Sequence, residues 1–226
     1  MNAIPEVKKA AWLCFDLDGT LVDSVPDITF SINEMLVSLG FDTVEESLAR
    51  SWVGNGADKL IERALTHVQK KLPDESLFLG AKKLFLAAYD KNLAVKTTIY
   101  PGCIETLKYF FEKQIPMACV TNKPRQFTPA LLDRLGLSLY FSALVCGDDL
   151  DAKKPDPQPI LEAIRQLDGK PESGYMVGDS ETDILAAKRA GSGAIYVSYG
   201  YNRGVPVEMH NPICINQLVE LQTLFE

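Results

Sequence analysis

The chain has 226 residues, of which 46% are hydrophobic, so it is long enough to bury a full core. Its 30 Asp and Glu residues outnumber its 23 Lys and Arg residues, and the resulting net charge of -7 argues against nucleic-acid or anionic-membrane partners. The five cysteines are scattered and odd in number, and the N-terminal apolar run is too short for a secretion signal, so we expect reduced thiols and a cytoplasmic protein.

The first predicted strand, AAWLCF, runs from residue 10 to residue 15 and ends in two aspartates, Asp16 and Asp18. Two like charges at the end of a buried strand cost stability unless a cation or a reaction requires them. The alternative is that both acids only form a turn. Gly19 and Thr20 follow directly and would let the chain turn away from the strand, and we expect both to be substrate-binding residues. We therefore expect a functional site here.

A helical region follows this strand, with almost no β-rich sequence before residue 117. Apolar residues recur with helical spacing in three segments: 27–40, 57–71 and 75–93. This texture predicts a helical cap domain at 21–95, inserted into a core made of 1–20 and 96–226.

Strands and helices alternate after about residue 100. Strands are predicted at 117–122, 143–148, 174–179 and 194–200, and helices at 101–114, 127–136, 158–168 and 181–191. This alternation indicates an α/β fold, with a doubly wound, Rossmann-like parallel sheet covered by helices on both faces. Ligands of such sheets bind at the carboxyl ends of the strands, where Thr121, Asn122 and Asp179 would join Asp16 and Asp18.

The predicted site is rich in carboxylates, and the chain has only two histidines. Oxygen ligands of this kind suit Mg²⁺ better than zinc. A carboxylate that attacks a phosphoryl group also needs a cation to neutralise the phosphoryl oxygens. The segment DAKKPDPQP supplies Lys153 and Lys154, and its prolines would hold a lysine in a fixed place. We favour Lys154, which adjoins the first proline, but the two lysines could exchange roles.

Four motifs occur in order along the chain: FDLDGTLVDS, VTNK, KKPDPQP and GDSETD. Together they resemble the haloacid dehalogenase superfamily of phosphatases, with the helical region as its cap domain. The resemblance implies that Asp16 is the nucleophile and Asp18 the general acid and base, with Thr121 and Asn122 near the phosphoryl group and Lys154 balancing charge. It also implies Mg²⁺ ligation by Asp16, the backbone carbonyl of Asp18, and Asp179, supported by Asp183. Asp183 could instead be only a first-turn acid of a helix, favoured by the helix dipole.

The cap segment SWVGNGADKLIERAL resembles the phosphoglycolate phosphatase branch of that superfamily. The resemblance implies hydrolysis of a small phosphorylated metabolite, 2-phosphoglycolate in particular, by a monomer or homodimer. Other sugar or nucleotide phosphates, pyrophosphate and a phosphomutase reaction remain alternatives. The apolar stripe predicts a helix that begins near Asn55 and Gly56, with Asn55 as its cap and Arg63 in solvent. We expect Gly54, Asn55 and Gly56 to bind the substrate's carboxylate, or else to form only a turn.

Overall fold

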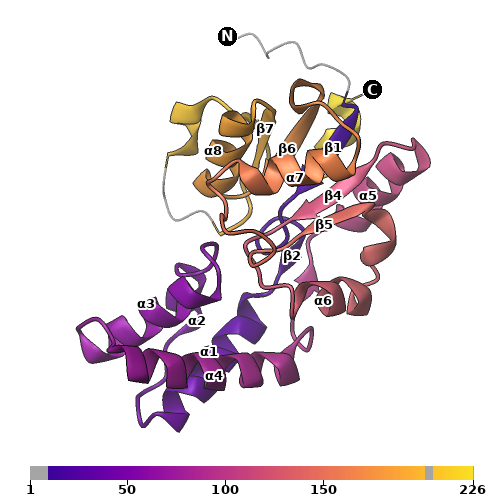
Figure 1. The fold of residues 1–226 in the computed structure, drawn as a ribbon. Coiled ribbons are helices and arrows are strands. Elements are labelled where there is room, and N and C mark those ends of the chain that lie inside the picture. Colours follow the sequence, from indigo (N-terminus) through magenta and orange to yellow (C-terminus); the bar gives the residue numbers. More distant parts are fainter. Residues whose placement is uncertain (1–9, 202–205, 226) are drawn as a thin grey trace.

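The computed structural model describes residues 10–201 and 206–225, and its central feature is a six-stranded parallel sheet (Figure 1). The strands are β1 (Trp12–Phe15), β4 (Met117–Val120), β5 (Ala143–Val145), β6 (Gly174–Gly178), β7 (Gly193–Val197) and β8 (Ile213–Ile215). Their order is β5-β4-β1-β6-β7-β8, and every neighbouring pair is parallel. Phe15 is in register with Cys119 on one side and Val177 on the other. Residues that follow β1, β4 and β6 therefore meet at one edge.

Helices cover both faces of this sheet, as the alternating sequence predicted. They are α5 (Cys103–Glu112), α6 (Thr128–Arg134) and α9 (Glu220–Leu224) on one face, and α7 (Gln158–Gln166) and α8 (Glu181–Ala190) on the other. Short 3-10 helices are η1 (Ser138–Tyr140), η2 (Pro171–Ser173) and η3 (Val207–His210). Leu13 and Phe15 point into the first core, whereas Trp12 and Cys14 point into the second. The predicted doubly wound α/β core is confirmed.

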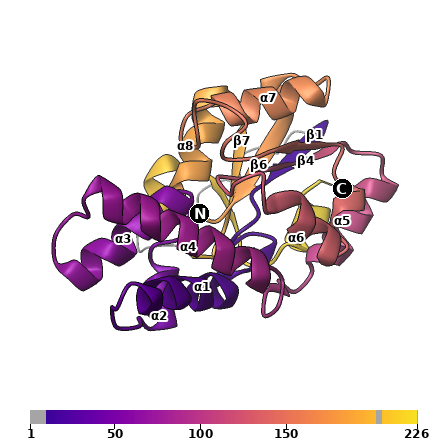
Figure 2. The same ribbon diagram turned by 60° about the horizontal axis from the view of Figure 1, so that its bottom comes forward.

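Four further helices lie beyond the edge of the sheet, in the lower part of Figure 1, and the second view also shows them as one group (Figure 2). They are α1 (Val25–Ser38), α2 (Glu46–Arg50), α3 (Ala57–Gln69) and α4 (Glu75–Asn92). Two short antiparallel strands, β2 (Val22–Asp23) and β3 (Thr98–Ile99), carry the chain into and out of this group. The division into a cap at 21–95 and a core at 1–20 and 96–226 remains a prediction, which this linker pair supports.

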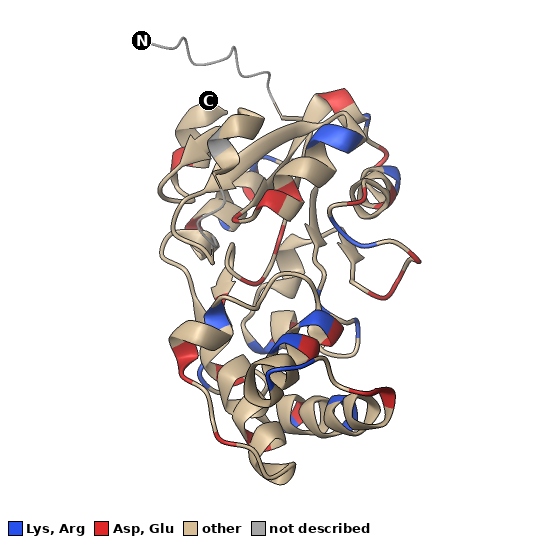
Figure 3. Ribbon diagram, turned by 90° about the vertical axis from the view of Figure 1, so that its left-hand side faces the viewer, with Lys and Arg blue, Asp and Glu red and all other residues tan. Residues whose placement is uncertain are grey.

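The cap helices pack through the apolar stripes that the sequence predicted. In α3 the buried residues include Leu60, Ile61, Ala64 and Leu65, which belong to the same core cluster as Phe85 of α4. Charged residues of both signs are interspersed along these helices (Figure 3). In the part of the chain that the structure describes, no helix combines the length and apolar character needed to cross a membrane.

Several short elements were not predicted from sequence, namely α2, β2, β3, β8 and α9. Each has two to five residues. Runs of that length are too short for a period of 2 or 3.6 residues to stand out. Their positions depend on the elements they pack against.

Asp27, near the start of α1, fastens the two linkers to each other. Its carboxylate is 1% exposed and accepts hydrogen bonds from the backbone N–H groups of Val95 (3.1 Å), Lys96 (2.8 Å) and Thr97 (2.9 Å). The Thr97 hydroxyl donates a fourth bond of 2.6 Å. The carboxylate therefore provides the hydrogen-bond acceptor for three consecutive backbone N–H groups, at residues 95–97, where the chain leaves the cap.

Replacing Asp27 with alanine should lower the free energy of unfolding by roughly 3 kcal/mol, because buried N–H groups lose their acceptor. Urea denaturation followed by circular dichroism measures the change. Asp74→Ala is the matched control: this exposed aspartate caps α4 by accepting from the Leu77 N–H, so its loss should cost only about 1 kcal/mol. Equal effects of the two substitutions would contradict the linker role of Asp27.

Candidate functional site

Three carboxylates converge at the edge where β1 and β6 end. Asp16 follows β1, Asp179 follows β6, and Asp183 lies in the first turn of α8. Each can offer one oxygen such that all three oxygens lie within 4.8 Å of one another. All three side chains are buried, with exposures of 8%, 2% and 0%. The strand pattern predicted Asp16 and Asp179 at this edge, and the family resemblance added Asp183; the structure brings all three together.

Lys154 lies among these acids. Its Nζ atom is 2.9 Å from Asp16 Oδ1 and 2.6 Å from Asp183 Oδ1, and it also donates to the carbonyl oxygen of Val120 at 2.6 Å. Lys153 is exposed and contacts neither acid in the described structure. Of the two candidate lysines, Lys154 is therefore the one that the proline-rich segment places against the carboxylates.

The electrostatics of the cluster favour a further cation. Burial raises the pKa of Asp16 to about 7; the charge of Asp183 adds to the increase, and Lys154 opposes it. Burial, together with Asp183 and Asp16, also holds the pKa of Asp179 well above its usual range. One ammonium group does not balance three buried carboxylates, so a divalent cation would relieve the remaining repulsion. The all-oxygen donor set fits Mg²⁺.

Asp179 is oriented by the segment that follows β1. Thr20 donates its hydroxyl to Asp179 Oδ1 at 3.0 Å, and the backbone N–H of Tyr201 donates to Oδ2 at 2.7 Å. Gly19 has a φ of +94°, and a Cβ atom there would lie 2.3 Å from Asp179 Oδ2. Gly19 and Thr20 therefore support the Asp179 carboxylate, and neither residue lines the two chambers described below.

Asp183 was predicted either to support the metal site or to be only a first-turn acid of a helix, and the structure shows it both in the acidic cluster and in the first turn of α8. Its Oδ2 atom accepts from the backbone N–H of Ser180 at 3.1 Å and from the Ser180 hydroxyl at 2.5 Å, which closes a capping box at the start of α8. Its Oδ1 atom binds Lys154. The same side chain thus caps the helix and joins the acidic cluster.

Asp18 is paired with a lysine that sequence reasoning missed. Lys123 Nζ lies 3.1 Å and 3.0 Å from the two carboxylate oxygens of Asp18, and the Ser24 hydroxyl donates to Asp18 Oδ1 at 2.5 Å. Lys123 is only 6% exposed. It is the last residue of the VTNK motif, but no local spacing shows that its side chain turns into the site.

Asn122 joins the core to the cap. Its Nδ2 group donates to the carbonyl oxygen of Gly54 at 3.1 Å and to that of Lys154 at 3.0 Å, while its Oδ1 atom accepts from the Lys154 N–H. Gly56 has a φ of +84°, and a Cβ atom there would be 3.2 Å from the Asn122 carbonyl oxygen. The Gly54–Gly56 loop is therefore closed over the core edge.

Two expectations about this loop are wrong. The N-cap of α3 is Gly56, without a side-chain capping bond, and not Asn55. Arg63 is half-buried rather than in solvent: it donates to the carbonyl oxygen of Trp52 at 2.6 Å and to Asn55 Oδ1 at 2.8 Å. Burial lowers the pKa of Arg63. Arg63 lies nearly two helical turns into α3, and its long side chain reaches back over the loop, where the guanidinium group donates to oxygens of Trp52 and Asn55.

A second link between core and cap passes through Tyr201. The Tyr201 hydroxyl donates to Asp23 Oδ1 at 2.9 Å and accepts from the Ser24 N–H at 2.8 Å. Arg50 of α2 binds both oxygens of Asp23, at 3.1 Å and 3.0 Å, and its guanidinium carbon lies 5.2 Å from the centre of the Tyr201 ring. These contacts tie the cap to the residue that holds Asp179.

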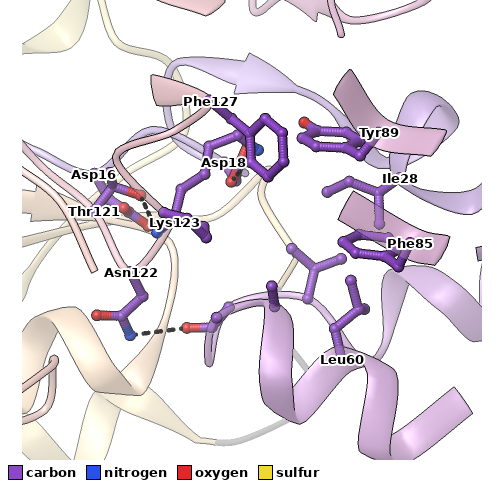
Figure 4. A pocket seen from close by; sticks show the side chains of 15 residues that line it. Asp16, Asp18, Ile28, Leu60, Phe85, Tyr89, Thr121, Asn122, Lys123 and Phe127 are labelled. Atoms are coloured by element: carbon purple, nitrogen blue, oxygen red, sulfur yellow. Dashed lines mark hydrogen bonds and ion pairs between the residues drawn. The ribbon is translucent and has the colours of Figure 1, made fainter. Parts of the chain in front are cut away.

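Two chambers open between the cap and the core. The acidic chamber contains Asp16, Asp18, Asn55 and Asp179 among its lining residues. The apolar chamber also reaches Asp16 and Asp18, but its far wall is formed by side chains of the cap (Figure 4). Its lining residues include Ile28, Val53, Gly54, Gly56, Leu60, Phe85, Tyr89, Thr121, Asn122, Lys123 and Phe127. Two different environments thus meet at Asp16 and Asp18.

Comparisons with known proteins agree with this geometry. The family model for haloacid dehalogenase-like hydrolases matches residues 13–197. A Nitrosococcus oceani protein named phosphoglycolate phosphatase is 41% identical over 219 residues, which cover 96% of this chain and 97% of that protein. A Pseudomonas aeruginosa protein named phosphoglycolate phosphatase 1 is 41% identical over 202 residues, covering 89% of this chain and 74% of that protein.

A solved structure is similar over the same length. The crystal structure of a predicted phosphoglycolate phosphatase from Haemophilus somnus superposes with a TM-score of 0.91 and 32% identity, covering 96% of this chain and 98% of that one. The arrangement of sheet and cap helices is therefore shared with a relative that differs at most positions.

Replacing Lys154 with methionine should destabilise the protein by roughly 3–5 kcal/mol at pH 8, because Asp16 and Asp183 would lose their buried partner. Chemical denaturation in the presence of a chelator measures this loss without a contribution from bound metal. Lys153→Met provides the control and should change the free energy of unfolding by no more than about 0.5 kcal/mol. A larger effect at Lys153 would reverse the assignment of the two lysines.

Proposed function

Because the chain belongs to the haloacid dehalogenase-like hydrolases, we propose that it is a phosphatase that hydrolyses 2-phosphoglycolate to glycolate and phosphate. The observation that carries this proposal is the placement of Asp16 against Lys154 and of Asp18 against Lys123, with both acids lining a chamber closed by the cap. Near-complete coverage by relatives named phosphoglycolate phosphatase supports the choice of substrate.

In the proposed reaction, Asp16 attacks the phosphorus atom, and an aspartyl-phosphate forms as the bond between phosphorus and the bridging oxygen breaks. Asp18 gives its proton to that oxygen, and glycolate leaves. Asp18 then takes a proton from water, whose oxygen attacks the phosphorus and releases phosphate and free Asp16. Thr121 donates to a phosphoryl oxygen, and Lys154 neutralises negative charge on the transferred group. Asn122 holds the Lys154 backbone in place.

We also propose Mg²⁺ as the cofactor, held by Asp16, Asp179 and the backbone carbonyl of Asp18. Asp183 supports the ion through its carboxylate and through Lys154. Bound there, the ion would neutralise charge on the phosphoryl oxygens and reduce their repulsion of the Asp16 carboxylate. The clustering of three buried carboxylates is the support for this assignment.

The Gly54–Gly56 loop is the part of the cap that we propose binds the substrate. Its glycines line the chamber, and α3 begins at Ala57 with no side chain capping its first N–H groups. Free N–H groups at a helix start favour an anion. Asn55 helps by accepting from Arg63, which keeps the loop in shape.

The setting that we propose is the cytoplasm, with a small phosphorylated metabolite as the only substrate class and a monomer or homodimer as the working form. Four of the five cysteines, all of which are free thiols, are buried. Buried free thiols are typical of proteins that work under reducing conditions.

Substitution of the two aspartates that follow β1 should affect turnover and phosphoenzyme formation differently. Asp16→Asn should abolish both turnover and the phosphoenzyme, because the nucleophile is lost. Asp18→Asn should slow turnover by a factor on the order of 10² to 10⁴, since the attacking group remains while proton transfer is lost. Phosphate release from 2-phosphoglycolate and acid-quench trapping of the phosphoenzyme measure these effects. Near-normal activity of Asp16→Asn would rule out the mechanism.

Stabilisation by Mg²⁺ should increase with pH. In the metal-free fold, the pKa of Asp16 is raised to about 7 and that of Asp179 is also raised. Their protonated forms therefore stabilise the fold fully below about pH 4, and this contribution is lost as pH rises through 7. Metal ligands must be deprotonated, so the increase in melting temperature on adding Mg²⁺ should be small at pH 5 and large at pH 8.

Differential scanning fluorimetry with and without Mg²⁺ tests this, and Asp179→Asn should largely remove the shift. Asp149→Asn is the control, because Asp149 is paired with Arg125 away from the cluster. A shift independent of pH, or activity that persists in a chelator, would contradict the assigned metal site.

A further inference from the structure

The apolar chamber presents a problem for an anionic substrate. Its cap wall is formed largely by Ile28, Leu60 and Phe85, and Phe127 closes the core side. Among the described residues that line it, Lys123 is the only one with a cationic side chain. Moving a carboxylate into such surroundings is costly unless it meets a cation or hydrogen-bond donors. Among the described lining residues, Lys123 is therefore the one cation that a carboxylate tail can meet, beside the N–H groups at the start of α3.

Lys123 is also in the right place. It binds both oxygens of Asp18, the proposed acid for the bridging oxygen of the substrate. In 2-phosphoglycolate, the carboxyl carbon is only two bonds from that bridging oxygen. A cation held on the acid is thus within reach of a carboxylate attached so close to the reacting atom. An ammonium group has three donors, so it can serve Asp18 and a second carboxylate together.

A second polar group faces the same space. Tyr89 of α4 is 2% exposed, and its hydroxyl makes no hydrogen bond of good geometry. Burial raises the pKa of Tyr89 to about 12, and nearby Lys123 opposes this increase, so the hydroxyl keeps its proton at neutral pH. Lys123 Nζ is 4.7 Å from the centre of the Tyr89 ring. Figure 4 shows the hydroxyl on the side of the ring that faces Phe127 and Asp18. A buried hydroxyl without a well-aligned hydrogen bond is unfavourable, and a ligand oxygen would satisfy it.

We infer that Lys123 and Tyr89 together bind the carboxylate tail of the substrate and select it over esters with an uncharged tail. This inference rests on the proposed phosphatase function and deepens it. Lys123 supplies the charge and Tyr89 a neutral donor, while the apolar wall limits the tail to a small group. Gly56 and Ala57, at the start of α3, line the same chamber, and no side chain caps this helix.

The competing explanation is structural: Lys123 only orients Asp18, and Tyr89 only packs against Phe85 and Phe127. In that case, substitutions at either position would change the hydrolysis of all monoesters by the same factor. Ethyl phosphate provides the comparison, because it replaces the carboxylate of 2-phosphoglycolate with a methyl group. The ratio of kcat/KM for the two esters isolates recognition of the tail.

Tyr89→Phe is the first test. It should reduce kcat/KM for 2-phosphoglycolate about 10-fold, mainly through KM, and leave kcat/KM for ethyl phosphate within about twofold. Its melting temperature should be unchanged or higher, because a buried hydroxyl without a partner is removed. Thr106→Val is the matched control: Thr106 in α5 also buries an unpartnered hydroxyl but lines neither chamber, so the selectivity ratio should stay constant. An unchanged ratio in Tyr89→Phe would overturn the role of Tyr89.

Lys123→Met is the second test and should lower the ratio about 100-fold or more, because a charged donor is lost. Any loss of Asp18 orientation affects both esters and cancels in the ratio. Lys123→Arg keeps the charge, so its selectivity ratio should lie between those of Lys123→Met and the unsubstituted protein. If Lys123→Met folds poorly, Lys123→Arg still tests the proposal, because its ratio should fall below that of the unsubstituted protein. Equal losses on both esters in both variants would assign Lys123 to Asp18 alone. If the unsubstituted protein releases phosphate from no monoester, the proposed function itself fails, which is a distinct outcome.

Discussion

The repulsion among three buried carboxylates is the constraint on which the rest of this structure depends. Asp16, Asp179 and Asp183 have oxygens within 4.8 Å of one another, and among residues 10–201 and 206–225 only Lys154 forms ion pairs with two of them. Such an arrangement survives because the sheet fixes its strands and a capping box fixes α8. The energy that opposes folding at this edge becomes useful when a metal ion and a phosphoryl group arrive, since the acids are already in place to receive them.

The cap is joined to this edge by contacts that also shape the site. Asn122 binds the Gly54 carbonyl of the cap loop and the backbone of Lys154, so loop closure and lysine placement share one side chain. Lys123 similarly binds Asp18 while facing the aromatic ring of Tyr89. Because the same groups close the cap and line the site, a substrate that fits can exclude water without disturbing the acids.

Local patterns in the sequence were enough to predict five of the six strands of the parallel sheet, the three long cap helices and the convergence of Asp16 and Asp179 at one edge. Apolar runs ending in Asp16 and Asp179 carry this information, because parallel strands end at the same edge wherever they lie in the chain. The contact of Lys123 with Asp18 and the partial burial of Arg63 were not predicted, because no local pattern indicates them. The roles of both side chains depend on contacts with Asp18, Trp52 and Asn55 that arise only when loops have folded back, and a long cationic side chain can reach solvent or interior from the same backbone position.

Tyr201 contacts Asp179 through its backbone and the cap linker through its side chain. Its backbone N–H donates to Asp179, whereas its ring and hydroxyl meet Arg50, Asp23 and Ser24. Every amino acid except proline retains the backbone bond, so sequence drift at this position leaves the acid oriented while altering how firmly the cap is attached. The two contacts of Tyr201 therefore respond differently to substitution: the bond to Asp179 needs only a backbone N–H, whereas the contacts with Arg50 and Asp23 need the tyrosine side chain.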